Sequence, residues 1–103
     1  MSVASSPEPV LVTDNPRRHR YEVRRGEQVL GFVTYRREPG RITFLHAETD
    51  QSVQGQGVGN QLAAEALDDA RERGLAVIPL CPFIAEFIDR HPGYQDLVTE
   101  PRS

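Results

Sequence analysis

The chain of 103 residues contains a single cysteine, no tryptophan and no lysine. One cysteine cannot close an internal disulfide, which excludes a disulfide-stapled secreted scaffold. No apolar run approaches the ~20 residues that a membrane-spanning helix needs, so no membrane partner is expected. The first segment, MSVASSPEPVLV, lacks the basic start and long apolar stretch of a secretory signal, which makes a cytoplasmic location the expectation.

The charge balance narrows the choice of partners. Twelve arginines face 15 acidic residues, and the formal net charge is −3. A dedicated nucleic-acid binder usually carries a basic excess, so no nucleic-acid partner is expected. The basic run Arg17–Arg20 is more typical of a solvated loop or strand start than of a phosphate patch. Three scattered histidines and one cysteine suggest no zinc cluster, and no metal is expected.

The composition is that of one small globular domain. Hydrophobic residues make up 38% of the chain and charged residues 26%. The ends are polar, so we expect a flexible tail over residues 1–9, a single domain over 10–99 and a second tail over 100–103.

The first half of the domain has the pattern of an antiparallel meander. Strands are predicted at Tyr21–Val23, Val29–Arg36 and Arg41–Thr49, with short turns between them. Strict alternation in the third strand places four side chains on one face: Ile42, Phe44, His46 and Glu48.

In the second half of the domain, the apolar residues follow the ~3.6-residue period of an α-helix. Apolar positions in the segment 57–73 trace one face of a helix, which ends at Gly74. A short buried strand is predicted at 75–80, and Pro82 begins a second helix that ends near His91. The order β-β-β-α-β-α indicates an α+β fold, a mixed sheet in which a parallel crossover follows the meander.

The loop before the long helix has an unusual composition. The string Gln54–Gly59 contains three glycines, while the usual capping candidates Asp50 and Ser52 lie several residues too early. A bound phosphate would satisfy the free amides of such a helix start. The alternative is a plain glycine turn. Neither a P-loop nor a dinucleotide fingerprint matches.

These residues resemble a known signature. Gln54-x-x-Gly57-x-Gly59 is similar to the Q/R-x-x-G-x-G/A motif of the GNAT-type N-acetyltransferase superfamily. The strings LHAETD, VIPLCPF and RHPGYQDLV further resemble its minimal members of about 100 residues, over roughly residues 15–98. The resemblance implies a GNAT-like fold, acetyl-CoA as co-substrate and an amine acceptor, either a small molecule or a protein. The implied cofactor-binding residues are Thr49, Gln54, Gly55, Gln56, Gly57, Val58, Gly59 and Asn60.

Cys81 precedes Pro82 and is therefore expected at the N-cap of the second helix. A thiol at that position is near the positive end of the helix dipole, which lowers its pKa. It could act as an acyl-accepting nucleophile, or it could be a small buried hydrophobe. The minimal family carries a cysteine here that is proposed as an active-site residue.

His46 and Glu48 are the other candidates for catalysis. His46 could accept the proton of an attacking amine, and Glu48 or Asp50 could do so through a water. A satisfied histidine beside two solvated acids is the alternative. The minimal family typically has threonine after this histidine, where this chain has Ala47.

Two functions of different class remain after these observations. The first is an acyltransferase, in which an amine attacks acetyl-CoA directly or, as the minority route, through an acetylated Cys81. The second is a non-catalytic CoA-binding or interaction module. The acceptor and the oligomeric state are left open.

Overall fold

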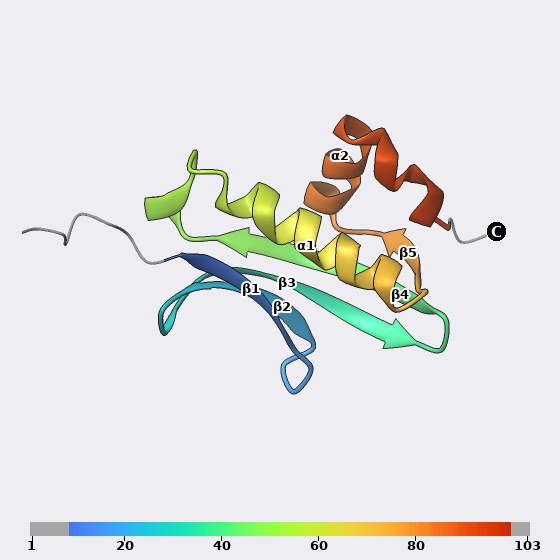
Figure 1. Ribbon diagram of the computed structural model, residues 1–103, viewed down its shortest axis with the longest axis horizontal. Coiled ribbons are helices and arrows are strands. Elements are labelled where there is room, and N and C mark those ends of the chain that lie inside the picture. Colours follow the sequence, from blue (N-terminus) through green and yellow to red (C-terminus); the bar gives the residue numbers. More distant parts are fainter. Residues whose placement is uncertain (1–8, 100–103) are drawn as a thin grey trace, which may run out of the picture.

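The computed structural model describes residues 9–99, so the expected tails lie outside the described residues except for Pro9. The strands are β1 (Val10–Asn15), β2 (Arg20–Arg25), β3 (Gln28–Glu38), β4 (Arg41–Thr49) and β5 (Ala76–Pro79). The helices are α1 (Val58–Glu72) and α2 (Pro82–Arg90), with short 3-10 turns η2 (Gln51–Val53) and η3 (Pro92–Leu97). The five strands form one sheet in chain order (Figure 1). Strands β1 to β4 are antiparallel, and β5 joins β4 in parallel.

The α+β class, the mixed sheet and both helices are confirmed, with two corrections. Strand β1 was missed, because only Val10 and Val12 pack against the core while Leu11 is 60% exposed at the sheet edge. The short buried strand predicted at residues 75–80 corresponds to β5. Of its residues only Val77 is fully buried, because β5 lies at the opposite end of the sheet.

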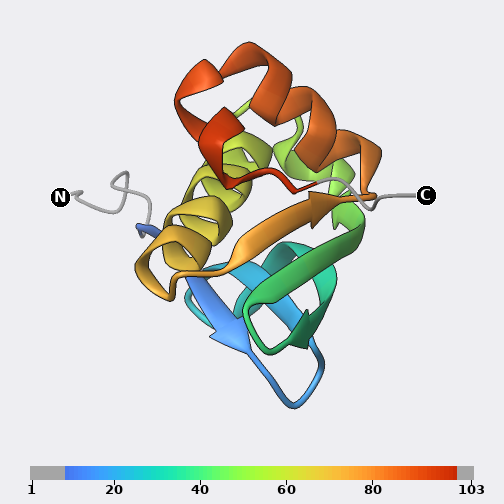
Figure 2. The ribbon, with the colours of Figure 1, turned by 90° about the vertical axis from the view of Figure 1, so that its right-hand side faces the viewer.

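Both helices lie on the same side of the sheet (Figures 1 and 2). Phe83 of α2 approaches Gly59 at the start of α1, where an added Cβ would lie 3.1 Å from its ring. At the other end of α1, Arg71 forms a salt bridge with Asp96 of η3. The other face of the sheet is covered by no helix within residues 9–99.

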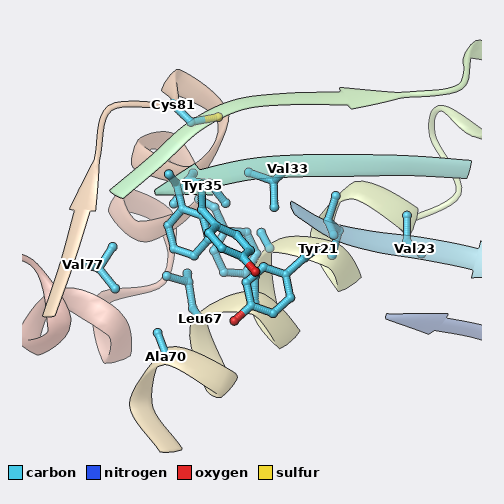
Figure 3. Packing of buried hydrophobic residues seen from close by; sticks show 14 of the residues in the cluster. Tyr21, Val23, Val33, Tyr35, Leu67, Ala70, Val77 and Cys81 are labelled. Carbon is cyan, nitrogen blue, oxygen red and sulfur yellow. The ribbon is translucent and has the colours of Figure 1, made fainter. Parts of the chain in front are cut away.

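The core lies between the sheet and α1 (Figure 3). Three alanines on α1, all fully buried, let the helix approach the strands closely: Ala63, Ala66 and Ala70. The rings of Tyr21 and Tyr35 fill the remaining space, with centroids 5.2 Å apart. Their hydroxyls donate to carboxylates at the core boundary, Tyr21 to Asp69 and Tyr35 to Asp14, both at 2.5 Å. The buried phenols are therefore satisfied.

A β-bulge divides β4 into two halves. Tyr35 pairs with Phe44 and Thr34 pairs with His46, so Leu45 is an extra residue without a partner on β3. An extra residue reverses the faces of all side chains that follow it. Before the bulge the even-numbered residues of β4 therefore face the helices, and after it the odd-numbered residues do.

The bulge overturns the predicted face of His46 and Glu48. Ala47 packs against the core, and Thr49 lies next to Gly59 of α1, so these residues share the helix-covered face with Ile42 and Phe44. His46 and Glu48 project from the uncovered face, with side chains 60% and 61% exposed. Alternation alone was the wrong rule, because it assumes an uninterrupted strand.

Tyr35 makes the free energy of unfolding depend on pH in the alkaline range. Burial, reinforced by the hydrogen bond to Asp14, raises the pKa of Tyr35 from 10.0 to about 12. The neutral phenol thus stabilises the fold fully below the unfolded pKa, and this contribution is lost as the pH rises towards 12. We expect the free energy of unfolding in urea to fall between about pH 9 and about pH 12, and Tyr35→Phe to reduce that fall. An equal fall in Tyr35→Phe would contradict this assignment.

Candidate active site

The glycine loop between β4 and α1 begins with a short capped turn. Asp50 accepts hydrogen bonds from the backbone N–H and the hydroxyl of Ser52, which lower the pKa of its carboxyl group. This carboxylate therefore caps η2 and not α1. The chain then turns through Gly55 and Gly57, whose φ angles are +86° and +80°. Residues with a Cβ rarely adopt such values, which explains the glycines.

The start of α1 has no internal cap. Gly57 is the N-cap residue, no side chain accepts from the first turn, and that turn contains no acidic residue. The first turn of an α-helix leaves its N–H groups without helical partners, here those of Val58, Gly59 and Asn60. Their dipoles favour an anion, and no carboxylate of the helix competes for the position.

A cavity of about 420 Å³ lies at this helix start. Its lining contains almost every residue that the resemblance implied, namely Thr49, Gln54, Gly55, Gly57, Val58, Gly59 and Asn60. Gln56 is the exception, since its side-chain amide donates to the carbonyl of Ser52. Phe83 of α2 also lines the cavity and was not identified from the sequence. An added Cβ at Gly57 would meet no atom within 4 Å, so the loop opens into free space.

Strands β4 and β5 separate beside this cavity. Their pairing ends where Phe44 meets Pro79, and the Cys81 N–H then donates to the Phe44 carbonyl at 2.9 Å. Within the described chain, no backbone hydrogen bond joins the remaining segment Leu45–Thr49 to β5 or α2. One edge of β4 is thus open along its second half, from the bulge to the glycine loop.

The uncovered face of the same segment carries the paired His46 and Glu48. The His46 Nε2 lies 2.8 Å from the Glu48 carboxylate. The His46 ring is also tilted against Phe32 of β3, with centroids 6.4 Å apart. A carboxylate bonded to one ring nitrogen fixes the orientation of an imidazole. The pair therefore offers an oriented ring nitrogen in solvent-accessible space, as a general base requires.

Cys81 is the N-cap of α2, as predicted, but its side chain makes no capping hydrogen bond. The residue is 1% exposed and belongs to the hydrophobic core (Figure 3). The structure therefore places the thiol on the covered side of the sheet, and it places His46 and Glu48 on the other side. The sequence did not reveal this separation, because the bulge that causes it has no local signature.

Gly31 of β3 explains how the end of β4 is held in place. An added Cβ at this position would lie 2.8 Å from the Glu48 carbonyl oxygen and 3.0 Å from Thr49 Cγ2. Only glycine allows such close contact between the strands. A glycine inside a predicted strand is a signal of close backbone approach, and it could have identified this position.

Comparisons with known proteins identify the family and the fold of the chain. A sequence model of the GCN5-related N-acetyl-transferase family matches residues 20–97, and the chain belongs to that family. The fold is similar to the NMR solution structure of a GCN5-like candidate N-acetyltransferase from Staphylococcus aureus. The TM-score is 0.66 at 23% sequence identity, over 94% of this chain and 93% of the other. A search of curated proteins found no match.

Residues 9–99 contain neither a membrane-spanning helix nor a metal-binding cluster. No helix in this range is long and apolar enough to cross a bilayer. No group of three or more histidine, cysteine, aspartate or glutamate side chains in the same range could hold a metal ion.

The loop geometry predicts a specific loss of anion binding. Gly57→Asp should weaken acetyl-CoA binding by about 100-fold or more, because it adds a side chain and a negative charge at the uncapped amides. Gly40→Asp is the matched control, since Gly40 has a φ of +81° and equally free space but lies in the β3–β4 turn. Calorimetric titration of both variants measures the effect. Equal affinities in the two variants would refute the assignment of the loop.

Proposed function

We propose that this protein is a cytoplasmic N-acetyltransferase, which binds acetyl-CoA at the glycine loop and transfers the acetyl group to an amine. The observation that carries the proposal is the uncapped start of α1 opening into a cavity beside the unpaired edge of β4. The amides of Val58, Gly59 and Asn60 would hold the pyrophosphate of the co-substrate. The open edge of Leu45–Thr49 would hold its pantetheine arm through backbone groups.

In the proposed reaction the amine nitrogen attacks the acetyl carbonyl carbon directly. A C–N bond forms, the C–S bond breaks, and CoA leaves as the thiolate. The amine must lose a proton, which His46 would accept while Glu48 orients its ring. Both groups are exposed on the uncovered face, where an acceptor from solution can reach them.

Removal of the proposed base gives the next prediction. His46→Ala should lower kcat by about 10²–10⁴-fold while acetyl-CoA binding stays unchanged, because the ring takes part in proton transfer and not in holding the cofactor. Release of CoA thiol with and without candidate amines measures turnover, and calorimetry measures binding. Saturable acetyl-CoA binding in the native protein without turnover on any amine would instead identify a binding module. Absence of binding would exclude both functions.

The covalent route through Cys81 makes a different prediction. It needs the acetyl group to reach a thiol that is 1% exposed, so we propose direct transfer as the main route and an acetylated Cys81 as the alternative. Cys81→Ala should then keep kcat within a few-fold. Intact-mass measurement after incubation with acetyl-CoA alone should show no acetyl adduct. An adduct that is lost in Cys81→Ala, together with a collapse of kcat in a folded variant, would establish the covalent route.

A further inference from the structure

We infer that the acceptor binds on the uncovered face of the sheet around Phe32, and that it is a small amine carrying an anionic group. This inference rests on the proposed function and concerns its second substrate. It follows from how three neighbouring strands place their side chains on the face that no helix of the described chain covers.

The register of β2, β3 and β4 aligns the relevant side chains in two adjacent rows. Arg20, Thr34 and His46 form one row, and Glu22, Phe32 and Glu48 form the other. The Arg20 guanidinium lies 4.5 Å from the centroid of the Phe32 ring, and the His46 ring lies 6.4 Å from it. A small molecule beside the Phe32 ring would therefore lie near both the guanidinium and the proposed base.

A cavity of about 240 Å³ marks this position. Arg20, Phe32, Glu48 and Asp50 are among the residues that line it, and His46 lies outside the lining. Thr49 lines both this cavity and the cavity at the glycine loop, so the two are neighbours at the end of β4. Pockets of drug-sized ligands usually exceed about 300 Å³, so this volume favours a small acceptor.

The cavity holds charges of both signs, since Arg20, Glu48 and Asp50 line it and Glu22 pairs with Arg20. The Glu22 carboxylate lies 2.7 Å from Arg20 and 3.6 Å from Arg24. Burial alone would raise the pKa of Glu22, but the hydrogen bonds from Arg20 and Asn15 outweigh it and lower the pKa, so this group stays ionised. Two guanidinium groups thus share one carboxylate. The Nε of Arg24 is also buried without a hydrogen-bond partner.

This arrangement fits an acceptor with two functional groups. The amine would meet the His46–Glu48 pair, the anionic group would meet Arg20, and the carbon atoms between them would pack on Phe32. A carboxylate or a phosphate supplies the same chemistry. A lysine-rich peptide would bring further cations next to Arg20 and Arg24, which already share one carboxylate.

The acceptor class is tested by comparing four amines: an amino acid, its uncharged amide, an amine bearing a phosphate and a lysine-rich peptide. We expect the native protein to prefer an anionic amine over the amide by about tenfold or more in kcat/KM, the value of one charge-assisted contact. The better of the amino acid and the phosphorylated amine identifies the anionic group. Equal use of acid and amide, or preference for the peptide, would overturn the inference.

Variants of Arg20 test the contact itself. Arg20→Met should raise KM for the anionic amine by about tenfold and leave KM for the amide unchanged, and Arg20→Lys should restore part of the loss. Arg36→Met is the matched control, since it removes a charge from the same face two residues beyond Thr34. Arg20→Met/Glu22→Gln keeps the buried charges balanced if the single variant folds poorly. Equal KM changes for both amines in the Arg20 variants would contradict the role of Arg20.

A binding measurement separates this inference from the proposed function. In NMR titrations of the CoA-saturated protein, the anionic amine should shift resonances of Arg20, Phe32 and Glu48, and Arg20→Met should abolish those shifts. Shifts without any acetylation would preserve the acceptor site and overturn the transferase. Acetylation without shifts on this face would support the transferase and overturn the acceptor site.

Discussion

The extra residue in β4 is the constraint on which the candidate site depends. Leu45 interrupts the ladder with β3 close to the point where pairing with β5 ends. Before the bulge β4 is an ordinary central strand with buried Ile42 and Phe44. After it, the strand turns Ala47 and Thr49 to the helices and His46 to the open face. One strand therefore contributes to the core, to an open backbone edge and to a polar pair.

At the start of α1, the contacts that stabilise the helix are different from the groups that are open to a ligand. Most helices gain about 1 kcal/mol from a capping side chain, and this one has none. Its stability comes from tertiary packing, since the helix buries Leu62, Leu67 and a run of alanines against the sheet. The amides at its N-terminus are consequently free for an anion. The polar bonds that secure the helix lie further along it, where Asp69 accepts from Tyr21 and from Arg73.

The uncovered face of the sheet leaves room beside the proposed cofactor site. Both helices lie on one side, so one short chain presents a cavity at a helix start and a polar patch on the opposite face. The two cavities share Thr49 at the end of β4.

Much of the architecture could be predicted from local patterns. The helical period, Pro82 and the glycine loop depend on neighbours in the sequence, so both helices and the Cys81 N-cap were identified correctly. Seven of the eight residues predicted to bind the cofactor line the loop cavity. Strand β1, the bulge at Leu45 and the patch formed by Arg20, Phe32 and Glu48 were not. These features depend on register between strands far apart in the chain. A shift of one residue reverses a face without changing composition or hydropathy, so only the tertiary structure decided on which side His46 and Glu48 lie.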